Sequence, residues 1–455
     1  MNAKKNKSKA WLWGLLVLLV IVPVIVLLIK RMEGTPPVLD LKLESPSLGA
    51  SQTLSIDISD SKSGLRQVWA AILKDGKETV LLDKSFRGAN ILMGGAIREQ
   101  TVEFQVEPKA LGLKDGKAIL RILARDYSWR HWGKGNQQYE EHDVFIDTHA
   151  PTIDVISPAL YISQGGSGVV IYQLSEECPT SGVTVGEDFY PGFGGHFKDS
   201  QTRMAFIALN YKQGRGTQMA VIATDYAGNQ GRVGLSRHIK AKQFRRDTIP
   251  INDSFLSWKM PEFADQVDSA PNTPMIDTFL KVNRDLRRRN YEQIVKATAD
   301  SEGRMLWKGG FLRLPRAANR AGYADHRKYT YKGKEIDKQT HLGMDLASLE
   351  NSPVPAANSG KIAFAGPIGI YGRTVIIDHG LGLFSLYAHL SKIDATAGQM
   401  VEKGDQIGLT GKTGLAGGDH LHFSVLVHHT FVNPIEWWDP KWIQDNILLK
   451  IDAVK

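Results

Sequence analysis

The pattern of hydrophobic and polar residues divides the chain into segments of different kinds. Residues 11–29 carry no charge and predict one long apolar helix. From residue 35 to 245, short runs alternate apolar and polar residues, as in Thr53–Ser59 and Ala118–Ala124. Alternation predicts β-strands, because successive side chains of a strand point to opposite faces. Asp-Gly pairs at 75–76 and 115–116 separate these runs, as expected for an antiparallel sandwich.

A helical period follows the alternating region. Ile276, Phe279, Leu280 and Leu286 recur at roughly helical spacing, so a short helical connector is predicted within residues 246–300. The polar positions of this helix are basic: Lys281, Arg284, Arg287, Arg288, Arg289 and Lys296. A solvated helix face accounts for these charges. A docking patch for acidic groups is the alternative.

Two short sequence similarities indicate an internal repeat. Pro37–Leu41 recurs as Pro151–Val155, and Leu123–Tyr127 recurs as Ile222–Tyr226. The offsets of 114 and 99 residues match the size of one sandwich domain each, and both units resemble bacterial immunoglobulin-like domains. The predicted fold class is mainly β. The predicted domains are a basic tail (1–10), a transmembrane anchor (11–29), two immunoglobulin-like sandwiches (35–148 and 149–245), the connector (246–300), an antiparallel-β domain (301–440) and a C-terminal tail (441–455).

Charges around the apolar segment predict its orientation. Lys4, Lys5, Lys7 and Lys9 precede the segment, whereas only Lys30 and Arg31 follow it. The larger positive charge on the N-terminal side predicts a cytoplasmic N-terminus and an exported body. A cleaved signal peptide has a shorter apolar core and a small-residue cleavage site. Because neither is present, the segment is interpreted as a retained single-pass anchor.

The overall charge adds little about partners. The formal net charge is +8, but six of these positive charges lie within residues 1–31, which leaves +2 for the rest. This balance gives no support for nucleic-acid binding. The single cysteine, Cys178, excludes an intramolecular disulfide.

Histidines gather in the last third of the chain, where eight of the 13 lie between His326 and His429. A catalytic zinc takes three protein ligands from His and carboxylate and keeps one position open. Residues 415–428 are predicted to form a strand, on which His420 and His422 point to the same face. His341 and Asp345 are four residues apart, a spacing that returns to one face of a strand or helix. We therefore expect these groups to converge on an open metal site.

The motifs around these histidines resemble the lysostaphin-type zinc metallopeptidases, the LytM-like murein endopeptidases. The resemblance covers about a quarter of the chain. Besides His341–Asp345, the motifs follow the order of that family: Val354–Gly360, Tyr371–Gly372, Ile377–Gly380, Leu386–Ser391, Val401–Asp405, Gly408–Gly414 and His420–Phe423.

The resemblance implies roles for five residues. His341, Asp345 and His422 match the zinc ligands of the family, which implies one Zn²⁺ per chain. His389 and His420 match its two non-ligand catalytic histidines. Histidine titrates near neutral pH, so either could be the general base while the other donates a hydrogen bond. Tyr329, Tyr331 and Glu335 are left without a role because their register relative to His341 is uncertain.

These features predict a membrane-anchored zinc endopeptidase that hydrolyses peptide cross-links of peptidoglycan, with its catalytic domain in the periplasm or extracellular space. The alternative is a non-catalytic envelope scaffold that recruits or activates another wall hydrolase. A third possibility is an exported protease that acts on proteins. The expected partners are peptidoglycan, the cytoplasmic membrane and an envelope protein docked on the sandwiches, with no nucleic acid.

Overall fold

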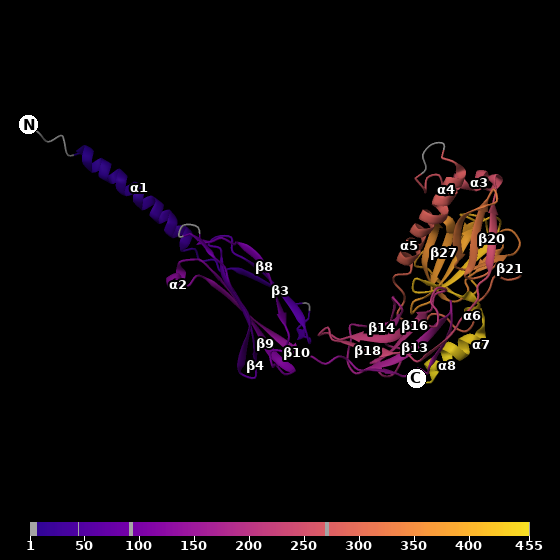
Figure 1. Cartoon of the computed structure of the whole chain (residues 1–455), viewed down its shortest axis with the longest axis horizontal. Coiled ribbons are helices and arrows are strands. Elements are labelled where there is room, and N and C mark those ends of the chain that lie inside the picture. Colours follow the sequence, from indigo (N-terminus) through magenta and orange to yellow (C-terminus); the bar gives the residue numbers. More distant parts are fainter. Residues whose placement is uncertain (1–6, 44, 91–93, 269–272, 455) are drawn as a thin grey trace, which may run out of the picture. The chain divides into compact units, whose positions relative to one another are not determined.

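The computed structural model describes residues 7–43, 45–90, 94–268 and 273–454, which form two compact units (Figure 1). One unit extends to Pro151 and includes Thr224–Gln230, and the other contains Thr152–Ala223 and Gly231 onward. Strands predominate in both units. The predicted mainly β fold is therefore confirmed.

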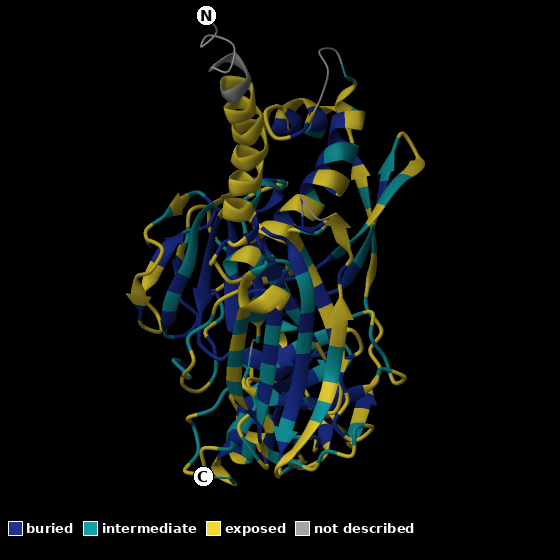
Figure 2. Ribbon diagram, turned by 90° about the vertical axis from the view of Figure 1, so that its left-hand side faces the viewer, coloured by how far each residue is buried: buried dark blue, intermediate teal, exposed yellow. Residues whose placement is uncertain are grey.

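Helix α1 spans Lys7–Arg31 and continues through Pro23. Nearly all side chains from Trp11 to Ile29 are exposed, as the colouring in Figure 2 makes clear. Within the described residues, this is the one helix that is long and apolar enough to cross a membrane. The predicted N-terminal apolar helix is thus present.

The first unit contains two principal sheets, of order β1-β3-β8 and β2-β10-β9-β4-β5. Alternation determines the core: Leu54, Ile56 and Ile58 of β3 are buried, whereas the residues between them are partly exposed. The immunoglobulin-like character of this sandwich stays a prediction. Its elements are β1 (Val38–Lys42), β2 (Ser47–Leu48), β3 (Gln52–Ser59), β4 (Leu65–Lys74), β5 (Lys77–Ser85), β6 (Gly88–Asn90), β7 (Gly94–Gly95), β8 (Glu99–Val106), β9 (Gly116–Asp126), α2 (Arg130–Gly133) and β10 (Gln137–Ile146).

The segment that follows forms three small sheets, of order β11-β13-β16, β12-β19 and β15-β14-β17-β18. Whether it is immunoglobulin-like also stays a prediction. Its strands are β11 (Ile153–Val155), β12 (Leu160–Ser163), β13 (Ser167–Leu174), β14 (Thr180–Val185), β15 (Asp188–Pro191), β16 (Thr202–Ala208), β17 (Met219–Thr224), β18 (Gln230–Gly234) and β19 (Arg237–Lys240).

The connector begins with a strand rather than a helix. Residues Arg246–Ile251 form β20, which pairs in parallel with β22, so this segment belongs to a three-stranded sheet of order β20-β22-β23. The helical part that follows comprises α3 (Asp253–Lys259), η1 (Met260–Phe263), α4 (Met275–Lys281), η2 (Val282–Leu286) and α5 (Arg287–Ala297). A strand at this place was not visible in the sequence, because its pairing partner lies some 80 residues away.

An eight-stranded sheet forms the centre of the C-terminal domain. Its order is β21-β24-β32-β28-β27-β26-β30, with β33 paired to β32, and β25-β31-β29 form a further sheet. β28 and β32 are buried along their whole length. The strands are β21 (Ala318–Ala321), β22 (Asp325–Tyr331), β23 (Lys334–His341), β24 (Met344–Ala347), β25 (Pro353–Pro355), β26 (Gly360–Ile368), β27 (Gly372–Asp378), β28 (Leu383–Leu390), β29 (Lys392–Ile393), β30 (Met400–Val401), β31 (Gln406–Leu409), β32 (Leu421–Val427) and β33 (Thr430–Val432), with η3 (Gly369–Tyr371) between β26 and β27.

The C-terminal segment is helical and packs against strand β13. It contains α6 (Pro434–Trp438), α7 (Pro440–Ile443), η4 (Gln444–Leu448) and α8 (Leu449–Asp452). Trp437 is fully buried, and its indole N–H donates to the hydroxyl of Ser167 at 3.1 Å. One hydrophobic core therefore runs from Leu160 in β12 to Ile451 in α8 and supports the sheet that carries the site.

Candidate metal centre and catalytic cleft

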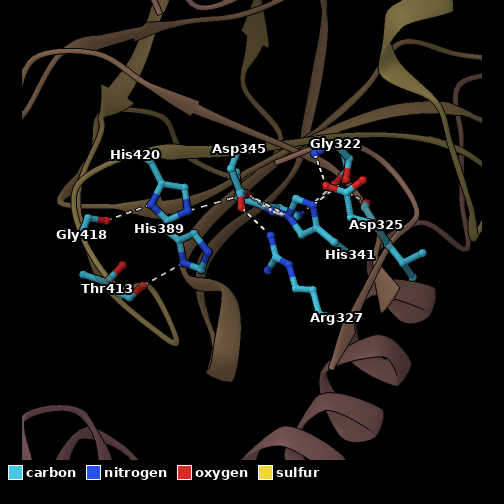
Figure 3. A network of polar contacts seen from close by, with 12 residues as sticks. Gly322, Asp325, Arg327, His341, Asp345, His389, Thr413, Gly418 and His420 are labelled. Carbon is cyan, nitrogen blue, oxygen red and sulfur yellow. Dashed lines mark hydrogen bonds and ion pairs between the residues drawn. The ribbon is translucent and has the colours of Figure 1, made fainter. Parts of the chain in front are cut away.

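Three of the predicted residues, His341, Asp345 and His422, meet at one point. Figure 3 shows the first two of them side by side. His341 Nε2, Asp345 Oδ1 and His422 Nδ1 lie 2.9 Å from one another in each pairing, and all three side chains are buried. Zinc–nitrogen bonds of about 2.0–2.1 Å place the ligands of a tetrahedral site roughly 3.3 Å apart. The three atoms therefore have nearly the spacing that such a metal requires.

The three ligand candidates come from three strands. Asp345 of β24 and His422 of β32 are directly paired, whereas His341 ends β23 in a different sheet. The prediction that His341 and Asp345 share one regular element is therefore wrong. The chain bends at Gly343, where an added Cβ would lie 2.6 Å from the His422 ring and from the Ser424 hydroxyl. Only glycine leaves room for the His422 ring in this bend.

Hydrogen bonds hold each ligand histidine in one tautomer. His341 Nδ1 donates to the Gly322 carbonyl at 2.8 Å, so the lone pair of its Nε2 points inward. The Ser424 hydroxyl donates to the Leu342 carbonyl at 2.8 Å and can accept the Nε2–H of His422 at 3.1 Å. His422 Nδ1 then also presents a lone pair. Because facing lone pairs and a carboxylate repel one another unless a cation or proton lies between them, this donor set fits a metal ion.

Arg327 holds the second oxygen of Asp345. Its Nη2 donates to Asp345 Oδ2 at 2.9 Å, which leaves Oδ1 directed at the histidines. Burial opposes ionisation of Asp345, but the positive charges and hydrogen bonds that His341 and His422 supply when they are protonated outweigh burial and hold the pKa of Asp345 well below its usual range. Burial likewise disfavours the Arg327 cation, yet the attraction of Asp345 raises its pKa. Asp345 is therefore ionised, and its Oδ1 is the oxygen that could bind a metal ion.

Sequence reasoning missed Arg327. It lies near the start of β22, which spans Asp325–Tyr331. The position of Arg327 depends on the pairing of β22 with β20 and β23, which no local pattern reveals.

The two remaining predicted residues also face the site. His389 Nδ1 donates to the Thr413 carbonyl and His420 Nδ1 to the Gly418 carbonyl, both at 2.8 Å (Figure 3), so the Nε2 of each neutral ring carries a lone pair. His420 Nε2 lies 3.6 Å from Asp345 Oδ1, and the rings of His389 and His420 are 4.8 Å apart.

The backbone and surroundings of His389 are both unusual. Its φ is 64°, in the left-handed region that non-glycine residues rarely adopt, and such strain is concentrated at functional sites. Burial, together with the charges of His420 and His422, lowers the pKa of His389 well below its usual value. The imidazole is therefore neutral near pH 7 and able to accept a proton.

The predicted strand over residues 415–428 is shorter than expected. β32 begins at Leu421, and His420 makes only an isolated bridge to Gly411. His420 and His422 nevertheless both point into the site, so the same-face prediction for their side chains agrees with the structure.

A cleft of about 760 Å³ opens over these residues. Of the three residues left without a role in the sequence analysis, Tyr329 lines the cleft. The Tyr331 hydroxyl instead donates to Asp253, and Glu335 forms an ion pair with Lys338. The cleft also contains residues of the connector, among them Arg287.

Two other histidines of the cluster are structural. His379 is fully buried between the Ser359 carbonyl and the Ser385 hydroxyl, and burial lowers its pKa to about 4. His428 packs between Tyr190 and Phe193, also with a pKa of about 4 caused by burial. Neither residue lines the catalytic cleft.

Residues 339–434 match the sequence profile of Peptidase family M23. This range contains His341, Asp345, His389, His420 and His422. The resemblance predicted from the motifs is confirmed, and this part of the chain is an M23 peptidase domain.

Curated relatives share this domain. The DD-carboxypeptidase/endopeptidase Mpg of Neisseria meningitidis is 37% identical over 142 residues, 30% of this chain and 31% of that protein. The peptidoglycan DD-endopeptidase ShyB of Vibrio cholerae is 33% identical over 116 residues, 26% of each chain. The similarity thus spans at most about a third of these relatives. Among solved structures, the catalytic domain of lysostaphin from Staphylococcus simulans is 28% identical with a TM-score of 0.25, covering 29% of this chain and 98% of that one.

Proposed function

We propose that this protein is a membrane-anchored zinc endopeptidase that hydrolyses peptide cross-links of peptidoglycan. The convergence of His341, Asp345 and His422 within 2.9 Å, with lone pairs directed inward, is the observation that carries the proposal. The M23 match and the DD-endopeptidase names of two relatives support the substrate class. Zinc is proposed because two imidazoles and one carboxylate in a tetrahedral arrangement suit it.

The chain would hold the metal through His341 Nε2, Asp345 Oδ1 and His422 Nδ1. When bound, zinc supplies Lewis-acid chemistry that polarises a scissile carbonyl and makes water more acidic. His389 and His420 present Nε2 on the same side of the cleft. One of them takes the proton of the attacking water at Nε2 as the new C–O bond forms. The other can donate a hydrogen bond from Nε2 only when its ring is protonated. The proton taken from the water then passes to the leaving amine as the C–N bond breaks.

Helix α1 supports a location at the membrane. Its apolar length is sufficient for a bilayer core of about 30 Å, and its N-terminal flank is the more basic one. We propose a single-pass anchor with a cytoplasmic N-terminus, which places the peptidase domain on the side where the wall lies.

Digestion of purified sacculi tests the function. The full chain, solubilised in detergent and loaded with zinc, is incubated with sacculi with and without a chelator, and released muropeptides are identified by mass. We expect soluble peptides whose cross-links are cut, and their loss on chelation with recovery when zinc is restored.

Two results would contradict the proposal. Release that persists in a thoroughly chelated sample would exclude a metal-dependent reaction. Absence of release from the zinc-loaded protein, together with stimulation of a separate wall hydrolase, would favour the scaffold alternative.

A further inference from the structure

Three arginines of the connector line the catalytic cleft, and they differ in their counter-ions. Arg284 donates from Nε to Asp337 at 3.0 Å, so its charge is neutralised. Arg288 lies 4.0 Å from Asp285 and is largely exposed. Arg287 makes no ion pair with any residue that the structure describes.

Arg287 is nevertheless held in a fixed orientation by a neutral partner. Its Nε donates to the Asn283 carbonyl at 3.1 Å, and its Nη2 donates to Asn283 Oδ1 at 2.7 Å. Asn283 is fully buried, and its own amide donates to Asp337 at 2.8 Å. The guanidinium is therefore oriented before any ligand arrives, and its Nη1 has no acceptor within the described part of the chain.

The packing of α5 brings this charge close to the metal centre. Asn290 Oδ1 accepts the backbone N–H of Ile370 at 2.9 Å, which joins α5 to η3. The next residue, Tyr371, has its ring 5.6 Å from the His422 ring. Burial raises the pKa of Tyr371, and the nearby charge of Arg287 opposes that rise. Arg287 and the ligand histidines thus belong to one cleft.

We propose that Arg287 binds a free carboxylate of the peptide substrate, with Arg288 adding to the local positive charge. A half-buried cation without a counter-ion attracts an anion strongly, and a guanidinium fork suits a carboxylate in particular. The inference rests on the proposed function and narrows it. The substrate is a stem peptide that carries a carboxylate near the scissile bond, rather than an uncharged glycine bridge.

Paired substrates test this specificity. A synthetic cross-linked stem peptide with free carboxylates is compared with the same peptide in which the carboxylates are amidated, using the full zinc-loaded chain in detergent. For Arg287→Gln we expect KM for the acidic peptide to rise about tenfold with kcat within about twofold, because one charge-assisted contact is lost. Its kinetics with the amidated peptide should be unchanged. Arg287→Lys keeps the charge without the fork and should lie between.

Arg289→Gln is the matched control. Arg289 lies on the same helix, bonds the Gln266 carbonyl and does not line the catalytic cleft. Its substitution removes the same charge and should leave both substrates unaffected. A wild type that cleaves both peptides equally well, or an equal loss in Arg287→Gln and Arg289→Gln, would overturn the proposal.

Binding separates this inference from the proposed function. Anisotropy of the two labelled peptides is measured on the chelator-treated full chain, where no metal can bind the carboxylate. We expect the acidic peptide to bind about tenfold more tightly than the amidated one, and this difference to vanish in Arg287→Gln. Tighter binding of the acidic peptide without any hydrolysis would refute only the proposed endopeptidase activity. Hydrolysis that is insensitive to the carboxylate and to Arg287 would refute only the carboxylate site.

An independent observation concerns the loop Trp129–Lys134 of the first unit. The Trp129 N–H donates to the Arg31 carbonyl at 2.7 Å, and Arg130 Nε donates to the Met32 carbonyl at 3.0 Å. Met32 follows the last uncharged residue of α1 by three positions, which is about 5 Å along a helix. The loop therefore lies at the depth of lipid headgroups if α1 spans the bilayer.

The composition of this loop suits a membrane surface. Trp132 is fully exposed, and Arg130, His131 and Lys134 beside it are exposed as well. Tryptophan favours the membrane interface, and basic residues are attracted to anionic headgroups. We infer that Trp132 inserts into the bilayer interface as a second membrane contact. This inference rests on the anchor proposed for α1.

A fluorophore at residue 132 tests the contact. Trp132→Cys in a Cys178→Ser background is labelled with an environment-sensitive dye, and the full chain is reconstituted in vesicles containing anionic lipid. We expect a blue-shifted spectrum that a lipid-borne quencher suppresses. Lys77→Cys, at the exposed first residue of β5, is the control and should report water. A water-like spectrum at residue 132 would overturn the inference.

Discussion

The two walls of the catalytic cleft are built differently. On the sheet wall, β24, β28 and β32 present Asp345, His389 and His422, and hydrogen bonds fix the second polar atom of each side chain. On the helical wall, α5 presents Arg287, whose hydrogen-bond partner among the described residues is the neutral Asn283 of η2. Asp345 of the sheet wall pairs with Arg327, whereas Arg287 of the helical wall has no counter-ion among the residues that the structure describes.

We interpret the sheet wall as the part of the cleft that serves catalysis and the helical wall as the part that serves substrate recognition. A metal centre requires atoms placed to within a fraction of an ångström, which buried central strands can provide. A specificity contact tolerates more movement but requires an unsatisfied group. We therefore expect substitutions on the sheet wall to affect metal binding or kcat, and substitutions at Arg287 to affect KM.

The largest effect is expected at the metal ligands. His341→Ala removes one of three protein donors and leaves Asp345 and His422 facing each other. We expect the variant to lose its bound zinc and to lose activity by about a thousandfold or more. Metal analysis of the purified chain, with turnover on sacculi, measures both. His238→Ala, at an exposed position of β19, is the control, and an unchanged metal content in His341→Ala would contradict the ligand assignment.

The His389→Ala substitution distinguishes the role of the sheet wall in metal binding from its role in proton transfer. The variant keeps all three ligand candidates, so its zinc content should equal that of the wild type. Turnover should fall by roughly 10²–10⁴-fold, the usual contribution of general acid–base catalysis. The measurements are the same metal analysis and kcat. A His389→Ala protein that binds no zinc would show that the residue is structural, and one with full turnover would leave His420 as the sole candidate base.

A smaller effect is expected at Arg327. In Arg327→Gln the carboxylate of Asp345 loses its charged partner and is free to turn. We expect zinc affinity to fall about 10–100-fold, as is typical when the residue that orients a ligand is removed. Competition with a chromogenic chelator measures the affinity. Arg313→Gln, which removes an arginine bonded to Ala317 and Asn319 outside the cleft, should bind zinc normally.

The smallest effect concerns the support behind the sheet. Glu436 in α6 accepts the Ser167 N–H at 3.0 Å, and burial raises its pKa to about 7. A raised carboxyl pKa means that the folded protein prefers the protonated form. The stabilisation of the folded state by protonated Glu436 is fully present below about pH 4.5 and is lost as pH rises through about 7.

Glu436→Gln should therefore melt at a higher temperature than the wild type at pH 8, by roughly a few degrees, and at nearly the same temperature at pH 4.5. Thermal denaturation of the full chain across this range measures the difference. Glu402→Gln on an exposed turn should show no such trend. A difference in melting temperature that does not change with pH would contradict the assignment.

Local sequence patterns correctly predicted the features that depend on residues close together in the chain. Alternation in Thr53–Ser59 gave a strand with the correct buried face, and the uncharged run 11–29 gave the apolar helix. The motifs around His341 and His420, through their resemblance to a known family, identified five residues that lie together in the structure. The strand and helix predictions succeeded because the period and type of the side chains can be read directly from the sequence.

The tertiary structure decided the features that depend on distant pairing. β20 joins β22 across some 80 residues, which places Arg327 on Asp345. The bend at Gly343 brings His341 and Asp345 together from separate sheets, and the packing of α5 on η3 brings Arg287 into the cleft. The periodicity of neighbouring residues cannot predict these contacts, because each contact forms when several segments that are distant in the sequence pack together. The sequence determined which groups we propose for the chemistry, and the fold determined what orients them and which arginine we propose for recognition.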